Sequence, residues 1–285
     1  MPQLASLPLL LAVLSGCLVE PVCYTAEDCA AGQVCDPACG ECAPPPAGCA
    51  GPGDCPAGQS CVGGRCVPDS TGPLVCPDDM VAVSAGLCVD RYEASRPDAS
   101  AENAGADTSR AISRAGVLPW HVNPLTPEDV ARFDAACRRA GKRLCEADEW
   151  YAACAGGEGR PYAFGSVFNR ETCNCVDTFC DDYCAEQGIS DCSLGDNCGY
   201  DHWSFRLMPT GSFPDCIDAY GALDVSGNVW EVVWSATDPR GYEVRGGAYN
   251  CAGAAQRLRC TYNAGWDELY AGFRCCKGAQ DHGSP

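Results

Sequence analysis

The chain contains 285 residues, including 26 Cys, 32 Gly and 21 Pro, and its 38 acidic residues outnumber its 19 basic residues to give a formal net charge of -19. So many cysteines exclude the reducing cytosol and predict an oxidising compartment, because free thiols in this number would be reactive. The acidic excess disfavours any role that depends on neutralising nucleic-acid phosphates. A charged fraction of 20% and an apolar fraction of 46% exclude a disordered chain.

The N-terminus resembles a bacterial lipoprotein signal. Residues 4–13 form an apolar run too short to span a bilayer, and the sequence Leu-Ser-Gly-Cys follows at 14–17. The resemblance implies removal of residues 1–16 and a lipid on Cys17, although no Lys or Arg precedes the apolar run. Leu18 favours export to the outer membrane, where the lipid would be the only membrane contact. The alternative is an ordinary secretory signal, with Cys17 in a disulfide and the protein periplasmic or secreted.

Residues 17–72 contain a short tandem repeat rich in cysteine. The pattern C-x5-C-x5-C, with an Asp-Cys-x-Ala-Gly-Gln core, begins at Cys23 and again at Cys49. Units this small bury too little apolar surface to fold alone, whereas each disulfide contributes roughly 2–4 kcal/mol. We therefore expect a disulfide-rich stalk of open connectivity. A zinc site at Cys39 and Cys42 is disfavoured, because the segment has no His, and partner binding is a further alternative.

Residues 73–280 form the larger predicted domain. An apolar alternation from Met80 to Ser95 predicts β-structure, and the polar stretch 97–116 predicts a loop. Thr126 suits an N-cap and Pro127 the first helical position, so we expect a helix from there to about Gly141. A second, short helix is expected to start near Glu146, with an inward face made by Trp150, Ala153 and Cys154.

Four motifs occur in order within this domain. They are AC-x3-GKRLCE-x2-EW at 136–150, GALDVSGNVWE at 221–231, RGGAY at 245–249 and GFRC at 272–275. Together they resemble the formylglycine-generating enzymes, or sulfatase-modifying factors, and the resemblance covers roughly residues 76–277. It implies an α+β, irregular, loop-rich fold of the C-type-lectin-like kind. The high Gly count independently favours a loop-rich fold.

The resemblance also implies disulfides. Matching the family's pairs gives Cys137 with Cys275 and Cys154 with Cys260. Each bond would close a loop of over 100 residues and contribute nearly 5 kcal/mol by the chain-entropy model. Without Cys17, 25 cysteines remain. Because this number is odd, at least one thiol must be free or paired outside the chain, and Cys251 is the leading candidate.

A calcium site is implied by the second motif. Its ligands would be the carboxylates of Asp224 and Glu231 and the backbone carbonyls of Gly227 and Val229. Hard oxygen ligands around a Gly-permitted turn suit Ca²⁺. The alternative is that Asn228 and Glu231 only satisfy a buried turn by hydrogen bonds. A second calcium site would begin at Asn174, and its other ligands could not be matched.

The resemblance implies a copper site that this sequence fills only in part. In catalytic family members two thiols five residues apart bind Cu(I), and O2 oxidises a substrate Cys to formylglycine. The first thiol maps onto Cys251, but the second position falls at Ala255 or Gln256, and Ala248 replaces a family Ser. Soft Cu(I) favours thiolate ligands, and one sulfur holds it poorly. Another cysteine approaching in space, for which Cys276 is a candidate, would be needed.

Two functions from different classes therefore stay open. The first is an exported copper-dependent oxidase of a peptide Cys, with Cys251 as catalytic and copper-binding residue. The second is a non-catalytic cell-envelope protein whose lectin-like scaffold binds a peptide, a glycan or a protein partner. A thiohistidine-forming iron enzyme is disfavoured, because the three histidines are widely separated and no helical domain could hold them. A base for Cys251 from His121 or His202 stays open.

Overall fold

The structure is a computed structural model that describes residues 34–36, 41–43, 59–62 and 65–68 as backbone, and residues 75–193, 196–267 and 269–278 with side chains. The chain divides into two units, residues 1–71 and 72–285, each of which is described by itself. The predictions for the signal segment and Cys17 lie outside the described residues. No helix in the described ranges is both long and apolar enough to cross a bilayer.

The first unit contains one hairpin in each copy of the sequence repeat. β1 (Val34–Asp36) pairs antiparallel with β2 (Glu41–Ala43), and β3 (Gln59–Val62) pairs antiparallel with β4 (Arg65–Pro68). In each hairpin two cysteines are Cα partners, Cys35 with Cys42 and Cys61 with Cys66. The sequence repeat thus corresponds to a repeated hairpin.

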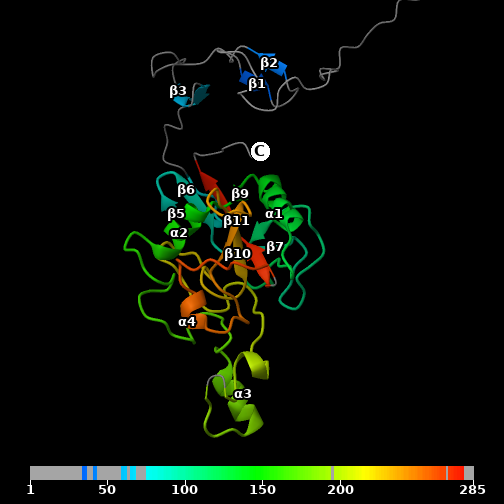
Figure 1. Cartoon of the computed structure of the whole chain (residues 1–285), viewed down its shortest axis with the longest axis vertical. Helices are drawn as coiled ribbons and strands as arrows, with labels where there is room; N and C mark the ends of the chain where they lie inside the picture. The colour runs from blue at the N-terminus through cyan, green and yellow to red at the C-terminus, as the bar shows by residue number, and fades with distance from the viewer. Residues whose placement is uncertain are drawn as a thin grey trace, which may run out of the picture. The chain divides into compact units, whose positions relative to one another are not determined.

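Two small sheets form the frame of the second unit (Figure 1). The first is antiparallel, in the order β5-β6-β13-β9, and so joins the two ends of the domain. The second has the order β11-β10-β12, in which β10 and β12 run parallel. A short pair, β7 and β8, completes the set. The bounds are β5 Met80–Ser84, β6 Leu87–Asp90, β7 Ala94–Ser95, β8 Ile112–Ser113, β9 Arg143–Leu144, β10 Trp230–Trp234, β11 Tyr242–Arg245, β12 Ala271–Phe273 and β13 Cys275–Gly278.

The predicted β-structure from Met80 to Ser95 is divided into three strands. A turn at Ala85 and Gly86 folds β5 back on β6 as a hairpin, and β7 leaves to pair with β8. The stretch 97–116 is largely irregular, as expected, apart from β8. The division at Gly86 follows from the turn-forming character of glycine.

Both predicted helices are confirmed. Helix α1 (Pro127–Arg139) starts at the N-cap Thr126, whose hydroxyl accepts from the Asp129 N–H at 3.2 Å, and Gly141 follows with φ +73°. Helix α2 (Ala147–Ala155) is capped by Glu146. As predicted, the side chains buried on α2 include Trp150, Ala153 and Cys154.

The largest buried cluster is aromatic. Phe133 of α1 stacks on Phe273 of β12 with ring centroids 4.3 Å apart, and Trp120 meets both rings edge-on at 5.9 and 5.6 Å. All three side chains are fully buried. Each of them removes a large apolar area from water, so this contact fixes α1 against the β10 sheet.

Seven disulfides join fourteen cysteines within residues 75–278. They include Cys137–Cys275 and Cys154–Cys260, the two pairs that the resemblance implied. The others are Cys76–Cys88, Cys145–Cys276, Cys173–Cys216, Cys180–Cys198 and Cys184–Cys192. Cys276 as a companion of Cys251 is therefore wrong, because its sulfur is bonded to Cys145.

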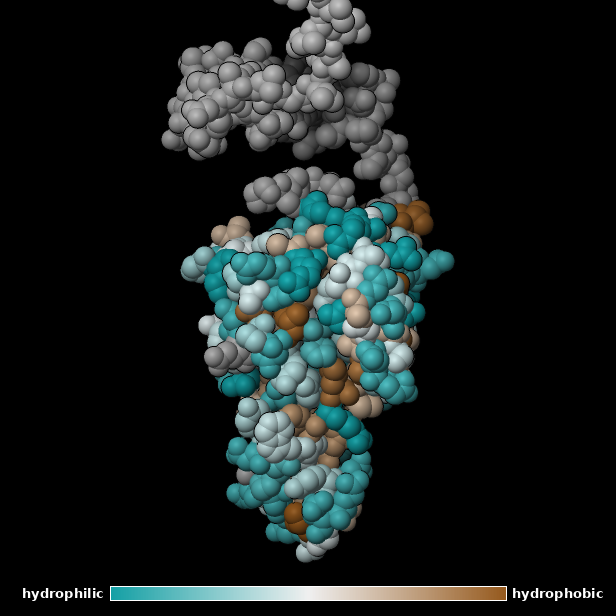
Figure 2. Space-filling view, turned by 90° about the vertical axis from the view of Figure 1, so that its right-hand side faces the viewer, coloured by the Kyte–Doolittle hydropathy of each residue, from teal (hydrophilic) through white to brown (hydrophobic). Residues whose placement is uncertain are grey.

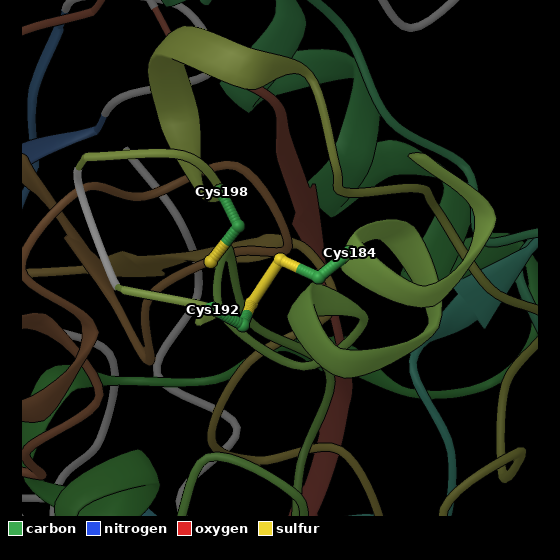
Figure 3. Close-up of side chains that lie close together, drawn as sticks. All are labelled: Cys184, Cys192 and Cys198. Carbon is green, nitrogen blue, oxygen red and sulfur yellow. A yellow bond between two sulfur atoms is a disulfide. The ribbon is translucent and has the colours of Figure 1, made fainter. Parts of the chain in front are cut away.

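The cysteine-rich segment 173–216 forms an arm that projects from the domain. Figure 1 shows α3 (Cys180–Gln187) at the end of the domain away from β5 and β6. The Cys173–Cys216 disulfide links the two ends of the arm. Three of its sulfurs, from Cys184, Cys192 and Cys198, lie within 4.8 Å of one another (Figure 3). All three belong to disulfides, so this cluster offers no thiolate to a metal.

Candidate functional site

A tight turn after β11 holds Cys251. Gly246 and Gly247 have φ values of +87° and +77°, and a Cβ on Gly247 would lie 2.6 Å from Leu258 Cδ1. The chain then turns so that the Cys251 N–H donates to the Ala248 carbonyl at 3.1 Å, and the Ala248 N–H donates to the Cys251 sulfur at 3.2 Å. The glycines and this turn fix the position of the thiol.

A cavity of about 270 Å³ opens beside Cys251. Its wall includes Trp230, Trp266 and Arg257 from the domain core and Tyr200 from the arm. Cys251 is only 3% exposed, whereas Trp266 is 38% and Tyr200 51% exposed. The site therefore consists of a nearly buried thiol below an accessible aromatic rim.

The aromatic rim continues away from the cavity on both sides. Trp266 meets Trp230 at 6.2 Å between ring centroids, and the Arg257 guanidinium lies 5.1 Å from the Trp266 ring. On the side of the arm, Tyr200 stacks on Phe205 at 5.9 Å, and the 79% exposed Trp203 lies 5.6 Å from the same ring. Figure 2 shows one face of the domain as mostly hydrophilic with small, separate apolar patches.

Cys251 is a neutral thiol in this environment. Burial raises its pKa to about 12, and hydrogen bonding with the Ala248 N–H and with Arg257 lowers it only in part. A thiol with so high a pKa is a poor nucleophile at neutral pH, because the thiolate is the reactive form. Cys251 is therefore poorly suited to act as a nucleophile.

The short helix α4 (Ala254–Arg257) carries the two residues at which the second copper thiol was expected. They are Ala255 and Gln256, and neither offers a sulfur. The Ala255 carbonyl accepts a hydrogen bond from the Tyr162 hydroxyl at 2.6 Å, which fixes the helix to the neighbouring loop. Helix α4 thus leaves Cys251 without its expected companion.

A second unpaired thiol, Cys175, was not selected from the sequence. It is fully buried in the arm's base, where the Thr178 hydroxyl donates to its sulfur at 3.4 Å. The sequence did contain a signal for an unpaired cysteine here, since the segment 173–216 contains seven cysteines. An odd number leaves at least one without a partner inside the segment.

The histidines make other contacts. His121 Nδ1 lies 3.0 Å from the Pro119 carbonyl and its ring packs against Tyr270, whereas the His202 ring packs against Tyr183. Neither of them is among the residues that line the cavity. Within the described part of the chain, the cavity therefore offers Cys251 no histidine base.

Glu231, expected as a calcium ligand, is fully buried and already bound by protein donors. Arg274 donates to its carboxylate through Nε at 2.9 and 2.8 Å and through Nη2 at 2.6 Å. The Trp150 indole donates to the same carboxylate at 2.5 Å. These bonds agree with the alternative in which Glu231 satisfies a buried turn.

The other expected carboxylate, Asp224, lies in the same buried region. It has φ +59° and accepts from the Gly211 N–H at 2.6 Å. Burial raises the pKa of Asp224 to about 7, and the charge of Glu231 adds to the rise. Glu93, which accepts from the Val229 N–H at 2.9 Å, also has a raised pKa because of burial. Three buried carboxyl groups thus lie near the single guanidinium of Arg274, and a divalent cation with oxygen ligands would favour their ionised forms.

Gly227 and Asn174 lie in contact at the predicted calcium region. A Cβ on Gly227, whose φ is +95°, would lie 2.5 Å from the Asn174 carbonyl oxygen. Asn174 Nδ2 donates to the Arg206 carbonyl at 3.0 Å and to Asn228 Oδ1 at 2.9 Å. Its own Oδ1 is buried and has no hydrogen-bond partner among the described residues. Such an oxygen is the kind of group that a hard cation satisfies.

Comparisons with known proteins agree on one family. The model of the sulfatase-modifying factor enzyme 1-like domain matches residues 90–279. The mouse protein named inactive C-alpha-formylglycine-generating enzyme 2 is 30% identical over 159 residues, which are 51% of this chain and 46% of the relative. The aligned region thus spans about half the length of this curated relative.

The solved structures that match this chain have little sequence identity to it. CarF is 15% identical, covering 67% of this chain and 86% of its own, with a TM-score of 0.39. PvdO from Pseudomonas aeruginosa is 19% identical, and the match covers 67% of this chain and 80% of PvdO, with a TM-score of 0.38. Treponema denticola variable protein 1 is 12% identical, and the match covers 67% of this chain and 84% of that protein, with a TM-score of 0.39.

Proposed function

The chain belongs to the sulfatase-modifying factor enzyme 1-like domain family, and from this premise we propose that it is an exported, non-catalytic member that binds a peptide segment at the Cys251 cavity. One observation carries the proposal. A nearly buried thiol lies below an exposed aromatic rim, and α4 supplies no second thiol beside it.

The rim supports binding of a peptide. Trp and Tyr side chains present a large contact area at low entropic cost, and exposed aromatic groups on a soluble domain mark interaction sites. Trp266 and Tyr200 line the cavity, and Arg257 beside them can donate to a peptide carbonyl. A cavity of about 270 Å³ is too small for a folded element and suits one or two side chains of an extended segment.

The residues present do not fit the family's copper reaction at its usual positions. Cys251 alone holds Cu(I) poorly, Ala255 and Gln256 have no sulfur, and burial keeps the thiol protonated. The mouse relative has the word "inactive" in its name, and loss of the reaction in this chain would parallel it.

A second candidate function is oxidation of a peptide Cys with Cu(I) and O2. The observation that favours it is that Cys251 is unpaired and lines the cavity, while fourteen other cysteines of the domain form disulfides. Conversion of a bound Cys peptide, detected as a mass change, separates this candidate from simple binding.

We further propose that calcium stabilises the domain. Asp224 and Glu231 would contribute carboxylate oxygens, and Gly227 and Val229 would contribute backbone carbonyls. The ion would supply positive charge to a region where three carboxylates face Arg274. A second ion at Asn174 would satisfy its unpartnered Oδ1.

The location that we propose is the bacterial cell envelope. A lipid on Cys17 would anchor the chain to the outer membrane, and residues 17–72 would act as a stalk. Its partner would be a peptide or protein of the envelope rather than a nucleic acid, because a net charge of -19 repels phosphates. A periplasmic or secreted protein is the alternative.

Selection from a displayed peptide library on the full chain tests the binding function. We expect enriched peptides whose binding depends on Trp266 and whose mass does not change when Cu(I) and O2 are added. Tyr151 offers a matched control, because it is also 38% exposed but does not line the cavity. A change in mass at a peptide Cys would favour the oxidase instead.

A further inference from the structure

A cavity of about 190 Å³ lies on the arm, and none of its lining residues also lines the cavity beside Cys251. One wall is formed by α3 with its N-cap residue, and the other is formed by the segment 203–206. We call this cavity the arm pocket. Its volume suits one side chain of a partner rather than a folded element.

Helix α3 presents one face to the arm pocket. Four of the lining residues share this face, because they follow one another at the spacings i, i+3, i+4 and i+7. They are Phe179, Asp182, Tyr183 and Glu186. The buried residues of α3 are Cys180 and Cys184, and both form disulfides with the later part of the arm. These bonds hold the helix in place, so the arm pocket has a fixed wall.

The facing segment brings aromatic rings to the same cavity. Trp203 is 79% exposed and has φ +55°, and its ring centroid lies 5.6 Å from that of Phe205. A bulky residue with positive φ is strained, so the fold holds an exposed indole here at a local cost. The Arg206 guanidinium lies 4.0 Å from the centroid of the Phe179 ring. This contact shows that the aromatic wall already attracts a cation.

Two carboxylates of the α3 wall lack a partner. Asp182 and Glu186 are exposed, and neither makes a hydrogen bond or an ion pair with any residue that the structure describes. By contrast, their neighbour Asp181 pairs with Arg170 at 2.8 Å. Like charges four residues apart on a helix repel each other and destabilise it. A cation bound between Asp182 and Glu186 would remove this repulsion.

The charge of the arm favours a basic partner. The segment 171–205 contains eight acidic residues and neither Lys nor Arg. The acidic residues are Glu171, Asp177, Asp181, Asp182, Glu186, Asp191, Asp196 and Asp201. A surface of one sign attracts a partner of the opposite sign and orients it. The aromatic rings of the arm pocket add an attraction for a cation that lies over a ring, which carboxylates alone do not provide.

We propose that the arm pocket binds a lysine or arginine side chain of a basic protein partner. The cationic group lies between the carboxylates of Asp182 and Glu186, and the aliphatic part of the side chain packs on the Trp203 indole. Arg206 limits the affinity, because its guanidinium occupies the Phe179 ring and repels a second cation. The inference goes beyond the peptide binding proposed at Cys251 and does not depend on it.

Fluorescence anisotropy with the full chain at low salt tests this site. Three labelled peptides share one glycine-rich sequence and carry lysine, arginine or acetyl-lysine at the same positions. Acetylation removes the charge of lysine and so isolates its effect. Binding of the lysine or the arginine peptide supports the proposal, and comparison of the two identifies the preferred cation. Equal binding of the acetyl-lysine and lysine peptides would overturn it, as would the absence of binding by all three.

Variants then locate the site. We expect at least about fivefold weaker binding in Trp203→Asn and in the double variant Asp182→Asn/Glu186→Gln. Asn replaces Trp203 because it tolerates positive φ, so the variant adds no backbone strain. Arg206→Gln should bind more tightly, because it removes the competing guanidinium. Weaker binding in Arg206→Gln would overturn the proposal. Circular dichroism checks that each variant is folded.

The double variant Asp191→Asn/Asp196→Asn is the matched control. It removes the same charge from exposed positions of the arm that do not line the arm pocket, and it should keep most of the wild-type affinity. Equal weakening in this variant and in Asp182→Asn/Glu186→Gln would overturn the proposal, because only the net charge of the arm would then matter. Selection of peptides that depend on Trp266 is a separate measurement, so failure at the arm pocket leaves the binding function untouched.

Discussion

Glu231 and Arg274 form an ion pair in which both side chains are 0% exposed. The guanidinium also donates to the Asp90 and Leu223 carbonyls, at 2.8 and 2.9 Å. The pair links β10 to the segment between β12 and β13, and so joins the two sheets of the domain. Both residues belong to motifs that carry the family resemblance.

Arg274→Met is expected to destabilise the domain by about 3–5 kcal/mol, because it leaves the Glu231 carboxylate buried without its partner. Urea denaturation measures the loss. Arg138→Met is the control, since that arginine is 43% exposed in its pair with Asp134 and should cost less than about 1 kcal/mol. Equal losses in the two variants would contradict the role given to the buried pair.

The free energy of unfolding should fall as the pH rises from about 4 to about 6, because of the buried carboxyl of Asp90. Burial raises the pKa of this carboxyl from 3.8 to about 6, although Lys142 lowers it. The native state therefore holds a proton that the unfolded state has lost, and a higher pH favours unfolding.

Lys142→Met should extend this loss of stability to higher pH and so make its total larger. The variant removes the Lys142 Nζ contacts with Asp90 at 2.6 Å and with Asp79, so the pKa of Asp90 rises further. We expect a larger loss of unfolding free energy at pH 8 than at pH 5, measured by denaturation at both values. A loss of the same size at the two pH values would show that the Asp90 charge is not responsible.

The length of the closed loop should decide how much each disulfide contributes. Cys154–Cys260 spans 106 residues and Cys184–Cys192 spans 8. The chain-entropy model gives about 4.8 kcal/mol for the first and about 2.5 kcal/mol for the second. Replacing each pair by Ser and comparing the free energies of unfolding tests the order. A larger loss from the Cys184–Cys192 pair would contradict the model.

Calcium chelation should lower the melting temperature of the wild type by several degrees. This shift corresponds to a loss on the order of 1–2 kcal/mol in the free energy of unfolding. Asp224→Asn should abolish this dependence. Asp218→Asn is the matched control: its carboxylate is also buried, and it accepts three backbone N–H bonds outside the proposed ligand set. A chelator effect that survives in Asp224→Asn would place the ion elsewhere.

Cys17→Ser should prevent lipid attachment. In a bacterial host, the wild type is expected to incorporate labelled palmitate and to fractionate with the outer membrane, whereas the variant should do neither. Labelling that persists in the variant would contradict a lipid on Cys17.

Local signals predicted a large part of the fold. Thr126, Pro127 and Gly141 delimited α1, because capping and backbone conformation depend on neighbouring residues. The ordered motifs identified the family, and the family match confirms the expected α+β, irregular, C-type-lectin-like class. The division of the first predicted β-segment into β5, β6 and β7 was missed, because β6 and β7 pair with distant segments.

The sequence predicted the features of the site that depend on a single residue, such as a glycine in a turn or a thiol at one position. The turn that holds Cys251 follows from Gly246 and Gly247. The absence of a second thiol on α4 is evident from the sequence, which has Ala255 and Gln256 at the two candidate positions. Cys175 was not singled out as a free thiol, because the pairing of the other cysteines depends on the fold of the arm. Nor did the sequence reveal that Cys276 is bonded to Cys145.

The affinity of an enriched library peptide tests the central claim most directly. Fluorescence anisotropy would give the Kd for the wild type, Trp266→Ala and Tyr151→Ala. Binding at the Cys251 cavity predicts equal affinity for the wild type and Tyr151→Ala, and about tenfold or weaker binding for Trp266→Ala. Equal affinity of all three proteins, or the failure of the library to yield any enriched peptide, would contradict it.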